Sequence, residues 1–149
     1  MSSFKGRYDY TVDNKGRLNI PVKIRKSLSP EANDTFILTR GYEQCLFLYP
    51  LDEWSKLETS IRDLPTADGQ NRYFVRTLLQ WTVEVQLDNQ ARVAIPQKLL
   101  EFARIESEVI VLGVLERVEI WNPAIYEAYM TSQSVSYEDV AATVLRPKS

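Results

Sequence analysis

The sequence predicts an α+β protein made of two copies of one small unit, each with the order β-β-α-β-β-α. A turn is repeated: VDNKGRLNIP at 12–21 aligns without a gap with LDNQARVAIP at 87–96. A longer block is repeated as well, since 36–54 matches 108–126. Two ordered matches of this kind indicate an internal duplication, and a unit of this size has too little core to stand alone. We therefore expect a pseudo-symmetric pair.

Alternating apolar and polar residues predict half-buried strands with antiparallel neighbours. The expected strands are 8–12, 17–20, 36–40 and 45–49 in the first copy, and 82–87, 92–95, 109–113 and 118–121 in the second. In the segment after the first turn, Leu18 and Ile20 share one face and Arg17 and Asn19 the other. Glycine is expected to close the third strand of each copy, at Gly41 and Gly113.

Helices are predicted between and after these strands. They cover 22–28, 51–64, 72–81, 97–103 and 123–130, with one or two further helical turns in the tail from 131. Pro21 and Pro96 stand where a helix can begin, because proline lacks the N–H that would be unpaired there. With 66–71 as linker, residues 1–70 form the first module. Residues 71–149 hold the linker helix, the second module and the C-terminal tail.

Composition argues against an enzyme. The 149 residues contain no histidine, which removes histidine-based nucleophile activation and histidine metal ligands. The five glycines are scattered singly, so no phosphate-binding loop is present. We expect no catalytic residues, no metal, no cofactor and no small-molecule substrate. The single Cys45 is expected to be a buried packing thiol.

Charge is distributed unevenly although the net charge is only −2. Residues 1–30 carry seven Lys/Arg and two Asp, a net of +5, whereas residues 31–149 carry a net of −7. The excess positive charge therefore surrounds the first copy of the turn, as expected for contact with nucleic acid. An ordinary solvated basic face is the alternative interpretation of the same charges.

Each repeated turn keeps an aspartate and an arginine four residues apart. Asp13 and Asn14 are suited to bond local backbone groups, and Gly16 accepts a positive φ. Together, the doubled D-x-x-x-R element, LFLYPLDEW and VIVLGVLERVEIWNP resemble the MraZ family over residues 4 to 145. The resemblance implies two tandem AbrB-like modules that form a pseudo-symmetric swapped-hairpin β-barrel with flanking helices.

The resemblance also implies a function. It indicates a sequence-specific transcriptional regulator of the bacterial division and cell wall gene cluster. Such a regulator binds short direct repeats in double-stranded DNA upstream of its own gene, as a ring-shaped homo-oligomer. The motif falls on Asp13 and Arg17, and again on Asp88 and Arg92, and the arginine is the DNA-binding element.

We expect the aspartates to shape the turns, because a carboxylate facing phosphate would be repelled. Arg17 is expected to lead the DNA contact, since Ala91 and Gln90 replace the glycine and lysine of the first copy. The remaining candidates for DNA contact are Lys15, Lys5, Arg7, Lys23 and Arg25. Tyr49, Trp54, Trp81, Trp121 and Tyr126 are assigned to packing rather than to base stacking.

Two further expectations concern partners and location. An alternative function is an antidote-like protein-interaction module, with the acidic remainder of the chain as partner surface and DNA binding secondary. No apolar run approaches the roughly 18 residues of a membrane span, and MSSFKGRYDY lacks an apolar signal core. We therefore expect a cytoplasmic, nucleoid-associated protein without membrane contact.

Overall fold

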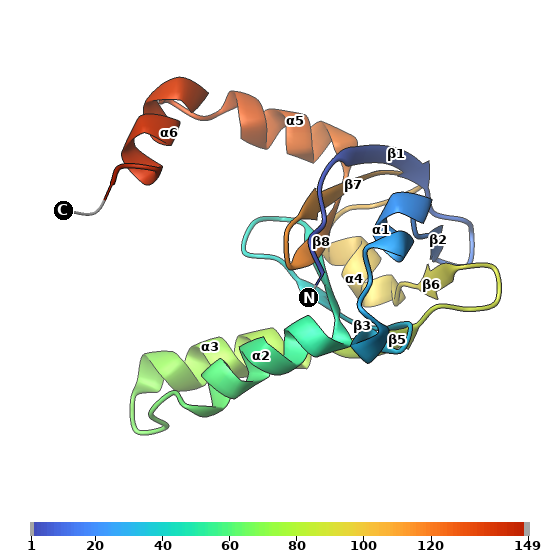
Figure 1. Ribbon diagram of the computed structural model, residues 1–149, viewed down its shortest axis with the longest axis horizontal. Helices are drawn as coiled ribbons and strands as arrows, with labels where there is room; N and C mark the ends of the chain where they lie inside the picture. The colour runs from blue at the N-terminus through green and yellow to red at the C-terminus, as the bar shows by residue number, and fades with distance from the viewer. Residues whose placement is uncertain (1, 148–149) are drawn as a thin grey trace.

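The computed structural model describes residues 2–147 of the chain and shows an α+β fold with antiparallel sheets (Figure 1). The first copy contains β1 Arg7–Thr11, β2 Arg17–Asn19, α1 Val22–Lys26, a 3₁₀ turn Pro30–Ala32, β3 Thr35–Arg40, β4 Leu46–Pro50 and α2 Leu51–Arg62. Helix α3 Gly69–Gln80 leads to the second copy. That copy contains β5 Val83–Gln86, β6 Arg92–Ala94, α4 Gln97–Phe102, β7 Glu108–Val114, β8 Arg117–Trp121, α5 Pro123–Thr131 and the tail helix α6 Tyr137–Val144. The predicted order of elements is confirmed.

Strand pairing exchanges hairpins between the two copies. The six-stranded sheet has the order β1-β7-β8-β4-β3-β5, so the first strand of each copy pairs with the third strand of the other. Strand β4 pairs with its equivalent β8, and β2 pairs with its equivalent β6 in a separate two-stranded ribbon. The swapped, pseudo-symmetric arrangement is confirmed. Continuous closure of the strands into a barrel stays a prediction.

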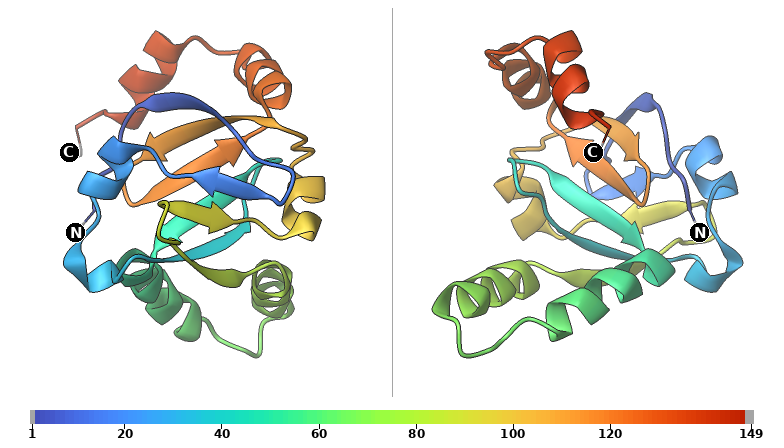
Figure 2. Two further views of the ribbon diagram at one scale, coloured as in Figure 1. Left: turned by 90° about the vertical axis from the view of Figure 1, so that its right-hand side faces the viewer. Right: turned by 60° about the vertical axis from the view of Figure 1, so that its left-hand side comes forward.

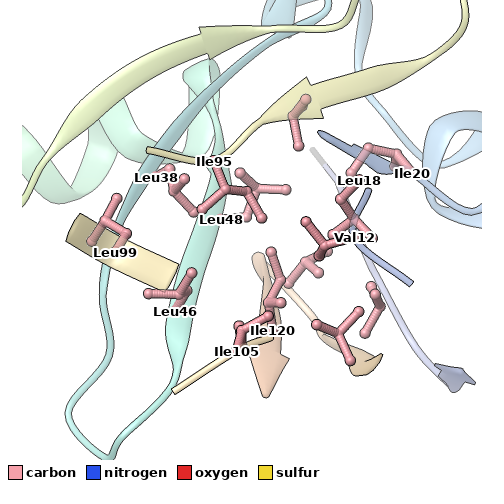
Figure 3. Packing of buried hydrophobic residues seen from close by; sticks show 14 of the residues in the cluster. Val12, Leu18, Ile20, Leu38, Leu46, Leu48, Ile95, Leu99, Ile105 and Ile120 are labelled. Carbon is pink, nitrogen blue, oxygen red and sulfur yellow. The ribbon is translucent and has the colours of Figure 1, made fainter. Parts of the chain in front are cut away.

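The larger of two hydrophobic clusters unites both copies. Leu18 and Val93 face each other across the β2–β6 ribbon and are fully buried. They pack with apolar residues of the six-stranded sheet, among them Leu38, Leu48 and Ile120 (Figure 3). Since each half contributes to the same cluster, neither module buries its apolar face alone.

A second cluster lies between the sheet and helices α2, α3 and α5. Trp54 and Trp121 are nearly fully buried there, and the ring of Tyr126 packs 5.2 Å from that of Trp121 between ring centroids. Tyr49 belongs to the same cluster, and Trp81 packs on Phe102 at 5.4 Å. The assignment of these aromatic residues to packing is confirmed. Cys45 is buried in the second cluster, also as expected.

Several boundaries differ from the sequence-based expectation. Strand β7 does not close at Gly113 but continues to Val114. A Cβ atom on Gly113 would lie 2.5 Å from the backbone nitrogen of Lys5, so this glycine admits a crossing chain segment. Pro21 and Pro96 precede the first residue of their helices as N-caps. Helix α1 ends at Lys26, earlier than expected, and α3 begins inside the predicted linker.

The repeated turns and the longer helices lie in different parts of the molecule. In Figure 1 both turns lie at the right beside β2 and β6, whereas α2–α3 and α5–α6 extend to the left. Figure 2 shows α5–α6 and α2–α3 on opposite sides of the strands. Among residues 2–147, no helix is long and apolar enough to span a membrane.

Candidate nucleic-acid interface

The first turn is organised by the carboxylate of Asp13. One carboxylate oxygen, Oδ1, accepts hydrogen bonds from the backbone N–H groups of Lys15 at 2.9 Å and Arg17 at 2.8 Å. The other, Oδ2, accepts from the side-chain Nε of Arg17 at 2.7 Å. The backbone N–H of Gly16 closes the turn on the carbonyl of Asp13 at 3.0 Å. Asp13 therefore both shapes the loop and orients the arginine.

The second turn repeats this arrangement. Asp88 accepts from the backbone N–H groups of Gln90 and Arg92 and from Nε of Arg92, each at 2.9 Å. The backbone N–H of Ala91 bonds the carbonyl of Asp88 at 3.0 Å. The turn-forming roles predicted for the two aspartates agree with these contacts. Asn14 lies within the first turn, but its side chain has no hydrogen-bond partner among residues 2–147.

The two turns are held together by the β2–β6 ribbon. Register pairs Arg17 with Ala94 and Asn19 with Arg92, so both arginines lie on the outward face of the ribbon. Diagonal neighbours of this kind stand about 7–8 Å apart. The amide of Asn19 also donates to the carbonyl of Gln90 at 3.1 Å, which ties the first copy to the second turn. We call residues 13–19 and 88–94 the paired turns.

Both arginines keep most of their donors free. A guanidinium carries five N–H groups, and here one of them, on Nε, is bound to the aspartate. Among residues 2–147, the terminal nitrogens of Arg17 and Arg92 have no hydrogen-bond partner. Their side chains are 33% and 19% exposed. The paired turns therefore present two oriented, four-donor cationic groups on one face.

Electrostatics favour an ionised aspartate in each turn at neutral pH. Hydrogen bonds from the backbone N–H groups of Arg17 and Lys15, with the Arg17 guanidinium, hold the pKa of Asp13 below its ordinary value. The corresponding donors, led by the backbone N–H of Arg92, lower the pKa of Asp88. Since each arginine is balanced by its own aspartate, the exposed Lys15 supplies the net positive charge of the paired turns.

The other predicted basic residues are spread more widely. Lys23 is exposed on α1, and Nε of Arg25 donates to the carbonyl of Ile20 at 3.1 Å, directly after β2. Arg25, Asn19 and Arg7 all line one open groove of about 810 Å³. This groove therefore brings Arg7 and Arg25 to a common surface beside the paired turns.

Two of the residues predicted to contact DNA, Arg7 and Lys5, are not placed beside Arg17 in the paired turns. Arg7 is bound to Glu127 of α5 at 3.1 Å and to Asp9 at 3.4 Å, and it lies over the ring of Tyr126. Lys5 precedes β1, and its neighbour Phe4 pairs with Leu115, which directly follows the last residue of β7. Neither Lys5 nor Arg7 is brought together with Arg17.

The comparisons with known proteins agree with the repeated architecture. The family described as "MraZ protein, putative antitoxin-like" matches residues 3–77 and again residues 78–146. The chain belongs to the MraZ family. The two matches together cover nearly the whole chain, and each match contains one of the paired turns.

Relatives in the MraZ family are similar over nearly their full length. A protein of Acetivibrio thermocellus named "Transcriptional regulator MraZ" is 44% identical over 93% of this chain and 94% of its own length. Proteins of the same name from Caldanaerobacter subterraneus subsp. tengcongensis and Halothermothrix orenii are 43% and 40% identical. These cover 91% and 95% of this chain, and 92% and 96% of their own lengths.

Asn19, which lies on the outward face of the paired turns, was not among the predicted site residues. It lies two residues after Arg17 on this face and directly opposite Arg92, and it lines the same groove as Arg25. Its outward position follows from strand alternation, which was visible in the sequence. Its bond to Gln90, 71 residues away, depends on the exchange of hairpins and has no local signal.

Proposed function

We propose that this protein is a DNA-binding transcriptional regulator whose paired turns contact the DNA. The observation that carries the proposal is the placement of Arg17 and Arg92 on one outward face, each with Nε held and its terminal nitrogens free. The relatives named as transcriptional regulators support it. The proposal describes a binding protein and not an enzyme.

The shape of the site suits the major groove. A two-stranded β-ribbon fits the roughly 12 Å width of that groove, and an arginine can donate to both acceptors of a guanine edge. Holding Nε leaves the two terminal nitrogens of Arg17 for such a bidentate contact, or for a phosphate. Arg92 would make the second contact on the same face. Asp13 and Asp88 would act by orienting these arginines.

The surrounding cations would position the backbone of the duplex. Lys15 in the turn and Lys23 on α1 are exposed and are proposed to contact phosphates. Arg25 and Arg7 would extend this contact along the groove that they border, in the case of Arg7 at the expense of its bond to Glu127. Lys5, which precedes β1, is proposed as a further phosphate contact.

In the proposed homo-oligomer, several subunits bind DNA at once, so their individually weak contacts add to a higher overall affinity. We propose a ring-shaped homo-oligomer that binds short direct repeats upstream of its own gene, within the bacterial division and cell wall cluster. Neighbouring subunits would then meet half-sites about 10 base pairs apart, and affinity would come from several simultaneous contacts. Each subunit would comprise modules 1–70 and 71–149. The expected location is the cytoplasm, on the nucleoid.

Fluorescence anisotropy tests the proposal with DNA from the upstream region at two salt concentrations. Arg17→Ala is expected to weaken binding by roughly 5- to 150-fold, because a good bidentate base contact is worth about 1–3 kcal/mol. Lys56→Gln is the control: it also removes one positive charge, but from α2, outside the paired turns. Equal binding by wild type and Arg17→Ala would overturn the proposal.

A second candidate function is an antidote-like interaction protein. It is favoured by the family description and by the net charge of −7 over residues 31–149. Salt dependence separates the two functions. Phosphate contacts predict a log–log slope near −0.9 per neutralised phosphate, whereas binding to a protein partner has no such requirement. A flat salt dependence of DNA binding would favour the second candidate.

A further inference from the structure

The outward face of the β2–β6 ribbon carries a different neighbour beside each arginine. Four side chains lie on this face, Arg17 and Asn19 from β2 and Arg92 and Ala94 from β6. Register places Asn19 directly opposite Arg92, and Ala94 directly opposite Arg17. Both Asn19 and Ala94 are exposed, and the ribbon lies at the side of the molecule away from α3 and α6 (Figure 1). One arginine therefore stands beside an amide and the other beside a methyl group.

The backbone of the ribbon is nearly two-fold symmetric. The N–H of Ile20 donates to the carbonyl of Ala91 at 3.0 Å, and the equivalent N–H of Ile95 donates to the carbonyl of Gly16 at 2.8 Å. A protein element with two-fold symmetry favours a DNA site with the same symmetry, which is a palindrome. Only side chains that differ between the two copies can therefore give the site of one ribbon a direction.

Few of the differences between the paired turns can read a base. Four pairs of equivalent residues differ, namely Lys15/Gln90, Gly16/Ala91, Leu18/Val93 and Asn19/Ala94. The Leu18/Val93 pair is buried, and the Gly16/Ala91 pair has no polar side chain. Lys15 is a point charge, which suits contact with phosphate. Asn19 is the polar difference that lies on a strand of the ribbon, directly beside an arginine.

The amide of Asn19 is held by one hydrogen bond and keeps its other groups free. Nδ2 donates to the carbonyl of Gln90 at 3.1 Å, and this bond distinguishes the nitrogen of the amide from its oxygen. The second N–H on Nδ2 and the oxygen Oδ1 have no hydrogen-bond partner within the described part of the chain. Asparagine reads adenine in the major groove by donating to N7 and accepting from the N6 amino group. The free groups of Asn19 match this pair of contacts.

We propose that Asn19 reads an adenine in the major groove close to the base read by Arg92, and thereby gives the DNA site a direction. Directly opposed side chains have Cβ atoms about 4.5–5.5 Å apart, and successive base pairs rise by about 3.4 Å. The adenine is therefore expected within two base pairs of the position that Arg92 reads. Ala94 supplies no hydrogen bond at the equivalent place beside Arg17. The inference rests on the proposed function, because it assigns a further contact to the same surface.

Competition binding with duplexes from the upstream region tests the assignment on the full chain. Each base pair of the bound segment is replaced by the three alternatives in turn, for wild type, Arg92→Ala and Asn19→Ala. Replacement of the adenine is expected to weaken binding by wild type about 5- to 150-fold. Asn19→Ala is expected to bind all four bases at that position nearly equally and to keep the wild-type preferences elsewhere.

The same series distinguishes base reading from a structural role of Asn19. If Asn19 only tied β2 to the second turn through Gln90, its loss would weaken binding to every duplex by the same factor. Such a uniform loss, or an unchanged preference at every position, would overturn the proposal. Circular dichroism establishes that each variant is folded.

Removal of the N7 acceptor tests the chemistry of the contact. A duplex with 7-deazaadenine at the assigned position keeps the pairing with thymine but lacks N7. Wild type is expected to bind it about 2- to 12-fold more weakly, as for the loss of one hydrogen bond, whereas Asn19→Ala should bind both duplexes equally. Equal weakening of the two proteins would contradict a contact between Asn19 and N7.

The reciprocal variant tests the origin of the direction. Ala94→Asn places a second amide opposite Arg17 and makes the outward face of the ribbon symmetric. It is expected to gain a preference for adenine within two base pairs of the position that Arg17 reads, and a gain at no position would contradict the proposal. Gln90→Ala is the control, because it removes an exposed amide from the turn but keeps the carbonyl that accepts from Asn19. Loss of the adenine preference in Gln90→Ala would overturn the assignment to Asn19.

The arginine variants separate this proposal from the proposed function. If Arg17→Ala and Arg92→Ala lose discrimination between bases while Asn19→Ala keeps it, the proposed function stands and the assignment of Asn19 fails. If wild type binds every duplex equally, both proposals fail.

Discussion

The two repeated turns have nearly the same hydrogen-bond geometry but differ in net charge and in the conformational strain of the backbone. Asp13 and Asp88 accept the same three hydrogen bonds, with lengths that agree within about 0.2 Å. The first turn carries Lys15 and Gly16 where the second carries Gln90 and Ala91. The shared aspartate and arginine thus make the same contacts in both turns, whereas the residues that differ between them change the charge and the strain.

The φ angles at Gly16 and Ala91 show the difference in backbone strain. Gly16 has φ +78° and Ala91 has φ +60°, both in the left-handed region. A residue with a Cβ atom is disfavoured there by about 1–2 kcal/mol. The second copy tolerates that cost, which indicates that the hydrogen bonds of Asp88 and the pairing of β2 with β6 fix the turn.

The largest expected effect comes from breaking the shared core beneath the two turns. Leu18→Ala is expected to lower the free energy of unfolding by about 2–5 kcal/mol, because Leu18 is fully buried. Val93→Ala, at the paired position, removes one carbon atom fewer and should cost less. Urea denaturation measures both. Since the core is common, unfolding should remain one transition; a separate transition for one half would contradict the shared core.

Exchanging the residues at the left-handed positions should have opposite effects in the two turns. Gly16→Ala is expected to destabilise by about 1–3 kcal/mol. Its Cβ atom would also lie 2.7 Å from the carbonyl oxygen of Ile95. Ala91→Gly should be neutral or stabilising by up to about 1 kcal/mol, because relief at positive φ offsets the entropy of glycine. Thermal unfolding measures the stability of both variants. Equal destabilisation of the two would contradict the predicted difference between the turns.

Exchanging the lysine between the turns should move DNA affinity by a smaller amount. Lys15→Gln is expected to reduce the magnitude of the log–log salt slope by about 0.9, because one phosphate is then no longer neutralised. Gln90→Lys should increase it if the second turn also faces the phosphate backbone. Anisotropy across a salt series measures the slopes. Unchanged slopes in both variants would remove Lys15 from the proposed DNA-binding surface.

The smallest effect should be a pH dependence shared by the two turns. The folded pKa of Asp13 and of Asp88 is lower than the unfolded value of about 3.9. The stabilising contribution is therefore complete above that value and is lost as pH falls through the folded pKa. Carboxyl-carbon NMR titration should show both groups with midpoints below the ordinary value for aspartate. Midpoints at the ordinary value would contradict the hydrogen bonds that each aspartate accepts.

Local patterns predicted the elements but not every contact. Alternation placed Leu18 inward and Arg17 outward, and the repeat showed that two copies share one fold. Position along the chain could not show that Arg7 lies against Glu127, because that pair is 120 residues apart and depends on how α5 packs. The sequence-based assignment of Gly113 failed for the same reason, since a crossing segment at Lys5 and not a turn requires that glycine.

In the candidate site too, the sequence predicted contacts within one turn but not contacts between distant residues. The D-x-x-x-R spacing identified each arginine and its aspartate, because both residues belong to one turn. The common face of Arg17 and Arg92 arises from the pairing of β2 with β6, which joins residues about 75 positions apart. The family resemblance predicted a swapped-hairpin arrangement, but neither it nor local periodicity predicted that these two strands pair.

The most direct test of the account compares Arg17→Ala, Arg92→Ala and the double variant on upstream DNA and on a scrambled duplex. We predict that both single variants lose discrimination between the two sequences, Arg17→Ala more strongly, while all three remain folded. Discrimination by Arg92→Ala equal to that of wild type would contradict a single DNA-reading surface built from both turns. Full discrimination by the double variant would remove the paired turns from DNA recognition altogether.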